Sequence, residues 1–307
     1  MSDLGRMFGS DGGRGTFLGV EAGPAKSGHK VALFGADTAT PYASVGPYCA
    51  GGAEAIRAGS AGYVANRAHV NFDTGGVTLG DGVLVDCGNV STGDDAAANR
   101  AAITAQAKEI LQAGAVPVCL GGDDSLPIPM GEALSGRDIW VVQVDAHIDW
   151  RDEVDGERFG LSSGLRRLSE MGHVSGITQI GQRGTGSARP SDTRDARDWG
   201  ATLVPARDWC RGGGREALDR IPEGADVLLC FDFDSLDPSI MPAVIAPTAG
   251  GLSYWDAVEI VERITARARI AAITMAEFMP ENDRTGQAAI LGAQLLTTWI
   301  GLMTADG

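Results

Sequence analysis

Short apolar runs alternate with helical patterns from about residue 31 onward, and this alternation limits the possible folds of the chain. The runs are rich in Val, Ile and Leu, and most are apolar on both faces, as strands buried on both sides of a sheet are. This alternation is typical of parallel strands joined by crossover helices. We therefore predict an α/β fold with strands at residues 31–35, 83–85, 116–121, 139–145, 177–181, 202–204, 227–232 and 271–277.

Three helices stand out between and after these strands. Apolar residues in the segment 103–111 share one helix face, and Gly114 follows at the position of a C-cap glycine. Ser253 and Asp256 have the spacing of a capping box, which predicts that a helix begins there. The segment 287–303 is apolar almost all round, so we expect its helix to be buried in the domain or at a subunit contact.

Composition and segmentation favour one folded domain. Hydrophobic residues make up 44% of the 307 residues and charged residues 21%, which are ordinary proportions for a soluble globular protein. No linker or internal repeat divides the chain, so we predict a single domain over residues 31–307, preceded by a Gly-rich segment, 1–30. The sequence has neither the apolar region of a signal peptide nor a stretch long enough to span a membrane. A cytoplasmic location is therefore expected.

The charge balance and the cysteines exclude several classes of function. Twenty-five Lys and Arg residues stand against 40 Asp and Glu residues, which gives a net charge of −15. Binding to nucleic acid or to an anionic membrane needs basic surface, so neither is expected as a partner. Five scattered cysteines without a C-x-x-C pair indicate neither a disulfide framework nor a zinc ribbon.

Acidic residues gather where two of the predicted strands end. Asp145, His147 and Asp149 recur at every second residue, which in extended chain places their side chains on one side. Asp232 and Asp234 repeat this spacing after another strand. Ligands of open α/β sheets bind beyond the carboxyl ends of the strands, so the two groups form one site if their strands are close.

Four carboxylates and one imidazole in one place repel one another unless cations lie among them. Such a set suits divalent ions such as Mn²⁺, and imidazole is also acceptable to Ni²⁺. Bridging carboxylates hold two ions about 3.5–4 Å apart in two-metal hydrolytic sites, so two ions are predicted. Either group alone is equally consistent with a solvated loop, and the run 232–237 lacks the Gly and Glu of an EF-hand. The two groups together favour a metal site.

Four ordered segments resemble the ureohydrolases, the family of arginase, agmatinase and guanidinobutyrase. They are G-G-D-D-S at 121–125, D-A-H-I-D at 145–149, D-F-D-S-L-D-P at 232–238 and A-E-F-M-P-E-N-D at 276–283, and the likeness extends from about Thr16 to the end of the chain. The resemblance implies a three-layer α/β/α fold with about eight parallel strands, assembled as a trimer or hexamer. It also implies a dinuclear manganese or nickel centre that hydrolyses a guanidino group to urea and an amine.

The resemblance further implies a role for each acidic residue. Asp145 and Asp232 would bridge the two metals, Asp149 would complete one of them, and His147 with Asp234 would complete the other. These assignments rest on the family pattern and not on the spacing of the residues.

One implied ligand departs from that pattern. The family reads G-G-D-H in the first segment, where the His ligates the first metal, and this chain has Asp124. Five carboxylates then face two divalent ions, so −5 against +4 leaves −1. Excess negative charge raises the pKa of bound water and weakens the nucleophile, although a carboxylate still ligates a metal.

Two further residues are implied to act on the substrate. Glu277, after the last predicted strand, stands where the family binds the guanidinium cation through charge-assisted hydrogen bonds. Ser163 stands where the family has a His that transfers a proton. Loss of such a general acid or base typically lowers the rate by about 10²–10⁴.

The two departures favour a degenerate subunit. We predict a weakly active or non-catalytic partner of an active ureohydrolase paralogue, in a hetero-oligomer that hydrolyses a small guanidino or biguanide (metformin) compound. Two alternatives stay open: an active dinuclear Mn or Ni enzyme of the agmatinase or guanidinobutyrase kind, and a metal-binding protein without hydrolytic activity. The second alternative leaves Glu277 unexplained.

Overall fold

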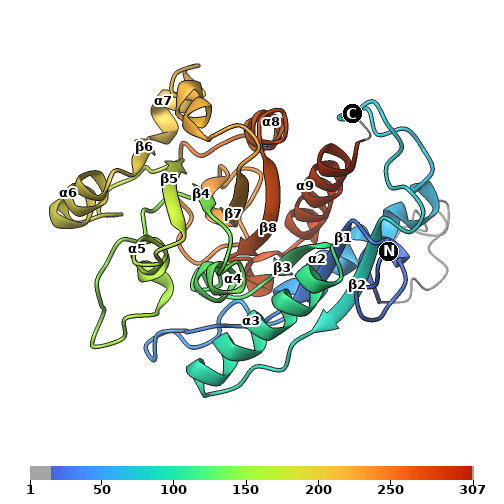
Figure 1. Cartoon of the computed structure of the whole chain (residues 1–307), viewed down its shortest axis with the longest axis horizontal. Coiled ribbons are helices and arrows are strands. Elements are labelled where there is room, and N and C mark those ends of the chain that lie inside the picture. Colours follow the sequence, from blue (N-terminus) through green and yellow to red (C-terminus); the bar gives the residue numbers. More distant parts are fainter. Residues whose placement is uncertain (1–14, 306–307) are drawn as a thin grey trace.

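The computed structural model describes residues 15–305, and these form one sheet of eight parallel strands (Figure 1). The strand order is β2-β1-β3-β8-β7-β4-β5-β6. The strands are β1 (Val31–Gly35), β2 (Leu84–Asn89), β3 (Val116–Leu120), β4 (Ile139–Val144), β5 (Val174–Ile180), β6 (Thr202–Val204), β7 (Asp226–Asp232) and β8 (Arg269–Ala276). The predicted parallel sheet is confirmed, with differences only at the strand ends.

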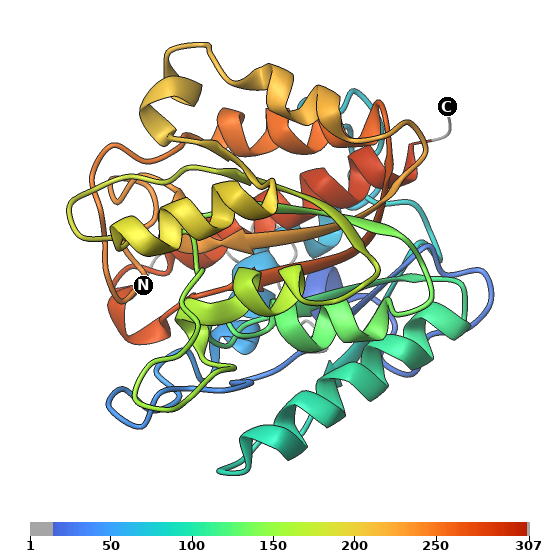
Figure 2. The ribbon, with the colours of Figure 1, turned by 60° about the vertical axis from the view of Figure 1, so that its left-hand side comes forward.

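Helices cover both faces of the sheet and make the three layers visible in Figure 2. On one face α2 (Gly52–Ser60) and α8 (Tyr254–Thr265) pack against α9 (Gln287–Thr304). On the other face α4 (Pro127–Ala133) packs between α3 (Ala96–Gln112) and α5 (Gly164–Ser169). The remaining helices are α6 (Pro190–Trp199) and α7 (Ala206–Cys210), with short 3-10 turns η1 (Phe17–Gly19), η2 (Ala61–Asn66), η3 (Leu161–Ser163), η4 (Arg215–Arg220), η5 (Phe233–Ser235) and η6 (Pro280–Asn282).

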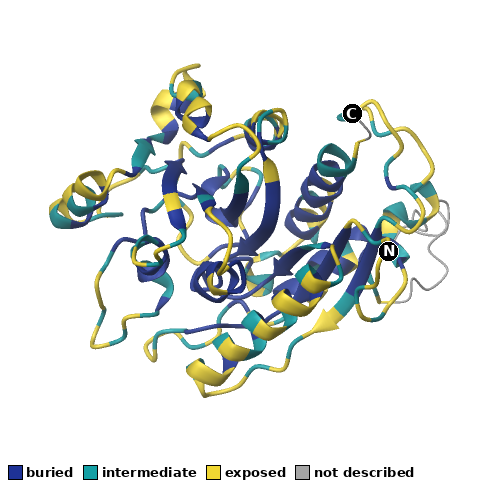
Figure 3. Cartoon of the chain, viewed as in Figure 1, coloured by how far each residue is buried: buried dark blue, intermediate teal, exposed yellow. Residues whose placement is uncertain are grey.

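Two hydrophobic cores, one on each face, follow from the alternation of side chains along a strand. On β7, Leu229 and Phe231 join the core beneath α8 and α9, while Leu228 and Cys230 join the core beneath α3 and α4. Both faces are therefore buried, which is why the strands read as continuous apolar runs. Figure 3 shows the buried strands between helices whose outer sides are exposed.

The three predicted helices are confirmed. Helix α3 ends at Gln112, and Gly114 has the positive φ of 87° that a glycine adopts without steric cost. Before α8, the Ser253 side chain accepts a hydrogen bond from the backbone N–H of Asp256, whose own carboxylate caps Ser253 in return. Most of α9 is buried, as its apolar composition predicts. No helix in the described part of the chain is long and apolar enough to cross a membrane.

Part of the predicted segment 1–30 packs into the domain, and residues 1–14 lie outside the described residues. Phe17 and Leu18 are fully buried, and the Phe17 N–H donates to Asp86 Oδ2 over 2.9 Å. Asp86 also pairs with buried Arg57, at 2.8 Å from Nε to Oδ2. These contacts join the chain before β1 to β2 and α2, while the boundary at residue 30 stays a prediction. The five cysteines are all free, and Cys210 is exposed.

Candidate metal centre

The two acidic groups meet because β4 and β7 are neighbours in the sheet. Val144 pairs with Phe231 at the ends of these strands, so Asp145 and Asp232 follow side by side. On its other side β7 pairs with β8, where Asp232 lies opposite Ala276 and brings Glu277 to the same edge. Parallel pairing thus gathers residues that are far apart in the sequence at one carboxyl edge.

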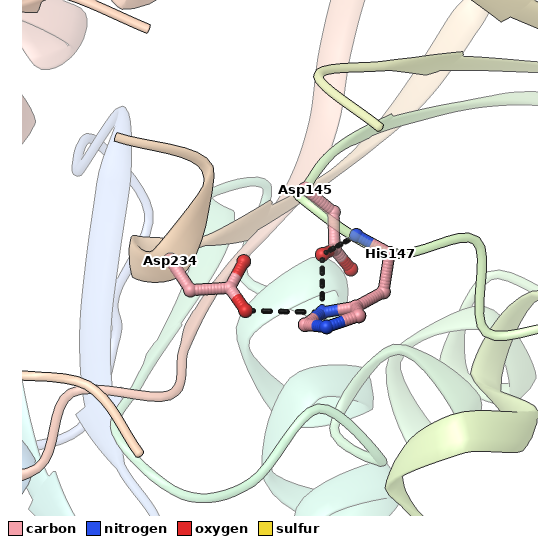
Figure 4. Close-up of side chains that lie close together, drawn as sticks. All are labelled: Asp145, His147 and Asp234. Atoms are coloured by element: carbon pink, nitrogen blue, oxygen red, sulfur yellow. Dashed lines mark hydrogen bonds and ion pairs between the residues drawn. The ribbon is translucent and has the colours of Figure 1, made fainter. Parts of the chain in front are cut away.

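One candidate ligand group consists of Asp145, His147 and Asp234 (Figure 4). His147 Nδ1 lies 3.0 Å from Asp234 Oδ2 and 3.3 Å from Asp145 Oδ1. Backbone groups fix the carboxylates, since the N–H of His147 donates to Asp145 Oδ1 over 2.6 Å and the N–H of Ala146 donates to Asp234 Oδ1 over 3.1 Å. The ligand atoms of the three residues all lie within 4.8 Å of one another.

A second candidate group consists of Asp124, Asp145 and Asp232, again within 4.8 Å of one another. Asp145 belongs to both groups, which is the arrangement a carboxylate bridging two ions requires. Asp124 reaches the site from the loop after β3, where Gly121 and Gly122 take positive φ values of 82° and 78°. A Cβ at Gly121 would lie 2.9 Å from the backbone nitrogen of Ala53, so the loop needs glycine at this close approach.

Asp149 joins the centre through an amide that sequence analysis missed. Gln143 Nε2 donates to Asp145 Oδ2 over 2.7 Å and to Asp149 Oδ2 over 2.6 Å. Gln179 Nε2 donates in turn to Gln143 Oε1 and, over 2.9 Å, to the carbonyl of Ile148. The available signal was a glutamine inside an otherwise apolar strand, two residues before the first aspartate.

The backbone between the end of β4 and Asp149 is not extended, contrary to the prediction from the sequence. Strand β4 ends at Val144, one residue earlier than predicted, and Asp149 has a left-handed φ of 42°. Such a conformation costs a non-glycine residue about 1–3 kcal/mol and persists where the surrounding contacts over-determine it. The side chains therefore converge through a bent loop and not through the period of a strand.

Burial makes the ionised carboxylates unfavourable without a cation. It raises the pKa of Asp124, Asp149 and Asp232 well above the usual range, and neighbouring carboxylates raise each of them further. His147 opposes the effect of burial at Asp145 and lowers its pKa to about 2, while Asp145 and Asp234 raise the pKa of His147 to about 12. Hydrogen bonds and neighbouring charges thus shift the pKa values of these groups in different directions.

The residues present fit divalent cations. Both carboxylate oxygens of Asp124 are buried and accept no hydrogen bond from any described residue. A buried charged group without a partner is strongly unfavourable, and an ion held by several carboxylates removes that cost. The donor set of carboxylate oxygens and one imidazole matches the preferences of Mn²⁺ and is acceptable to Ni²⁺.

A cavity of about 220 Å³ opens over the acidic groups. Its lining includes Asp124, Asp149, Trp150 and Glu277, so an aromatic ring stands beside the carboxylates. Glu277 is 4% exposed and its backbone has a φ of 69°, with its N–H donating to the carbonyl of Gly122 over 2.8 Å. Burial and, less strongly, Asp234 raise the pKa of Glu277, a hydrogen bond from Tyr48 opposes the rise, and the resulting pKa is about 8.

Ser163 is placed differently from the other candidate residues. It is fully buried at the start of α5, and its hydroxyl forms no hydrogen bond with any described residue. The cavity is lined instead by its neighbours Leu161 and Ser162. A catalytic role for Ser163 stays a prediction from the resemblance.

A parallel α/β/α sheet with carboxylates and an imidazole gathered at its carboxyl edge is the kind of scaffold on which metal-dependent hydrolases are built. A family model described as "Arginase family" matches residues 29–301. The chain belongs to the arginase family, which confirms the resemblance to the ureohydrolases.

Individual relatives agree with this assignment. The mitochondrial agmatinase of Gallus gallus is 33% identical over 200 residues, which is 62% of this chain and 57% of that protein. The chain thus spans less than two thirds of the length of this relative. Proclavaminate amidino hydrolase from Streptomyces clavuligerus shares the fold, with a TM-score of 0.80 at 23% identity over 94% of this chain and 96% of that one.

A second similar structure, formiminoglutamase from Trypanosoma cruzi, was solved with Mn²⁺. Its TM-score is 0.75 at 20% identity, and the match covers 91% of this chain and 95% of that chain. At this identity the likeness shows a common fold, and the ligand set of the present chain has to be argued from its own residues.

Proposed function

We propose that this chain is a metal-binding ureohydrolase subunit that takes part in releasing urea from a small guanidino or biguanide compound. The observation that carries the proposal is the meeting of Asp124, Asp145 and Asp232 with the group of Asp145, His147 and Asp234 beneath one cavity. Glu277 lines that cavity and offers a carboxylate for a guanidinium cation.

Two Mn²⁺ or Ni²⁺ ions fit the proposed ligand set. Such ions supply Lewis acidity, which lowers the pKa of bound water toward neutrality. The protein contributes orientation: Gln143 holds Asp145 and Asp149 together, and backbone N–H groups fix Asp145 and Asp234. Glu277 binds and orients the guanidino group at the wall of the cavity. The proposed metal ligands are Asp124, Asp145, His147, Asp149, Asp232 and Asp234.

Weak turnover by this chain alone is part of the proposal. Asp124 adds a negative charge where the family has a neutral ligand, and this raises the pKa of bound water. Ser163 has no group that titrates near neutral pH, and its hydroxyl is buried outside the cavity lining. An active paralogue with an intact G-G-D-H segment would supply the missing turnover in a hetero-oligomer.

An exposed apolar surface supports a subunit partner. Phe72 is 93% exposed, and Val70 and Trp255 are also largely exposed around a separate cavity of about 790 Å³. Apolar patches rimmed by polar residues mark protein interfaces. Members of the family are usually oligomeric, so a trimer or hexamer with a paralogue, or with further copies of this chain, is the assembly we propose.

The test compares the purified chain alone with the chain mixed with a G-G-D-H paralogue, both loaded with Mn²⁺ or Ni²⁺. Urea release is assayed from guanidine, agmatine, guanidinobutyrate and metformin, and bound metal is measured by mass spectrometry. We expect the chain to bind metal, to release little urea alone and to be required for full activity of the mixture. Ordinary enzyme rates from the chain alone would remove the partner role.

The active-enzyme alternative is favoured by one observation. The ligand atoms of Asp124, Asp145 and Asp232 lie within 4.8 Å of one another, which supports the proposal that the substituted residue acts as a metal ligand. If the chain alone releases urea at ordinary rates with two metals bound, it is an agmatinase-like or guanidinobutyrase-like enzyme. If it binds no metal, both readings fail.

A further inference from the structure

We propose that Tyr48 is a specificity residue that occupies one oxygen of Glu277 and so restricts how a guanidino cation binds there. The inference rests on the proposed function, in which Glu277 is the cation-binding carboxylate. Tyr48 belongs to none of the four segments that carry the family resemblance, and it lies 229 residues from Glu277 in the sequence.

The hydrogen bonds of Glu277 are unevenly divided between its two oxygens. The Tyr48 hydroxyl donates to Oε1, and the backbone N–H of Asp124 donates to the same oxygen over 3.0 Å. From the described residues, Oε2 receives no side-chain or backbone hydrogen bond. One oxygen is thus already used by the protein, and the other is left for a ligand.

This division matters because a guanidinium cation binds a free carboxylate best with two parallel N–H···O bonds, one to each oxygen. With Oε1 already accepting two hydrogen bonds, the cation is left with a one-oxygen contact. The Tyr48 hydroxyl donates its only hydrogen to Glu277, so its oxygen can only accept a hydrogen bond from a ligand. The protein therefore disfavours a bidentate contact between a guanidinium cation and the Glu277 carboxylate.

The loop that carries Tyr48 is held firmly against the end of β8. Gly51 has a φ of 79°, and its N–H donates to Asp37 Oδ1 over 2.9 Å. A Cβ at Gly52 would lie 2.9 Å from the carbonyl oxygen of Phe278, so glycine permits this close packing. Cys49, next to Tyr48, is 1% exposed. The phenol is positioned by packed backbone, and its contact with Glu277 is part of the fold.

The test measures binding of guanidinium and methylguanidinium to the metal-loaded chain by calorimetry and ligand-observed NMR. Tyr48→Phe keeps the ring and removes the hydroxyl, which frees Oε1 for the cation. We expect Tyr48→Phe to bind guanidinium about tenfold more tightly than the unchanged chain, as one added charge-assisted hydrogen bond predicts. Tyr63→Phe is the matched control, because it removes a phenol hydroxyl that contacts Gln294 away from the cavity.

Glu277→Gln in both backgrounds separates this inference from the proposed function. If Tyr48→Phe binds guanidinium no better than the unchanged chain while Glu277→Gln abolishes binding, Tyr48 does not restrict Glu277, and the proposed role of Glu277 survives. If Glu277→Gln leaves binding unchanged, the proposed function loses its cation site. If neither the unchanged chain nor Tyr48→Phe binds guanidinium, the inference is also overturned, because the oxygen freed in Tyr48→Phe should allow the cation to bind.

Discussion

Asp124 and Ser163 are the two residues at which the proposed site departs from the pattern of the resemblance, and they differ from each other in position. Asp124 lies in one of the candidate ligand groups, whereas Ser163 is buried and does not line the cavity. In the proposed function, the change at 124 therefore alters the charge of the metal centre, whereas the change at 163 removes a proton-transfer group without adding a new side chain to the cavity wall.

We predict that Asp124→His combined with Ser163→His gives partial activity to the chain alone. The first change removes one negative charge from the ligand set, and the second restores a group that transfers protons near neutral pH. Urea release with bound manganese is the measurement, and thermal unfolding checks that the buried site accepts the larger imidazole. A well-folded double variant with no gain in metal content or turnover contradicts the assignment of these positions.

Gln143 provides a second prediction for a single residue. Gln143→Leu removes the donor shared by Asp145 and Asp149, and loss of a group that orients metal ligands typically costs about 10–100-fold in metal affinity. We expect a loss of this size in manganese titrations. Gln112→Leu, an exposed glutamine at the end of α3, is the control and should bind metal normally. Equal affinity in Gln143→Leu would mean that the amide does not support the centre.

Among the elements, the segment after β7 is stabilised by a carboxylate outside the ligand set. Asp237 accepts hydrogen bonds from the Ser239 hydroxyl over 2.6 Å and from the backbone N–H groups of Gly250 and Gly251 over 2.9 and 3.1 Å. These bonds, first of all those from Ser239, lower the pKa of Asp237 to about 2. They join the loop after the candidate ligands Asp232 and Asp234 to the chain that enters α8.

We predict a pH dependence of stability from this lowered pKa. The stabilisation is present above the ordinary pKa of 3.8 and is lost as the pH falls toward about 2, because the folded state then binds a proton less readily than the unfolded state. Asp237→Asn should lower the free energy of unfolding by at most about 2 kcal/mol at pH 6. Denaturant unfolding at pH 6, 4 and 2.5 measures the free energy of unfolding of the variant and of the unchanged chain. The difference between the two free energies should shrink as the pH falls; a constant difference contradicts the mechanism.

For the whole molecule, the exposed apolar surface around Phe72 and Trp255 is where we expect subunit contact. Phe72→Ser with Trp255→Ser should weaken assembly with a paralogue or with further copies, because desolvation of large aromatic side chains dominates such interfaces. Light scattering after gel filtration measures the mass. Val45→Ser, at a side chain 41% exposed on the loop before α2, is the control. An unchanged mass in the double variant places the interface elsewhere.

Much of the fold and the centre could be predicted because the signals are local. The apolar runs predict seven of the strands to within about three residues at each end, and the run at 83–85 marks the start of β2, which continues to Asn89. Asp145 and Asp232 follow directly from their place after two such runs. The left-handed conformation of Asp149 could not be predicted, because Asp149 is held by hydrogen bonds from the Gln143 side chain and from the backbone N–H of Leu165, which folding brings to it.

The parallel sheet, its helices and the types of ligand atom available follow from the amino-acid sequence, because hydrophobic periodicity and residue chemistry are local properties of the chain. The sequence does not indicate that β4 and β7 are neighbours, that Asp145 belongs to both candidate ligand groups or that Tyr48 reaches Glu277; these follow from the folded structure. Such contacts join residues far apart in the sequence. They are set by the order of the strands and the packing of the loops, which depend on how side chains pack in the two hydrophobic cores.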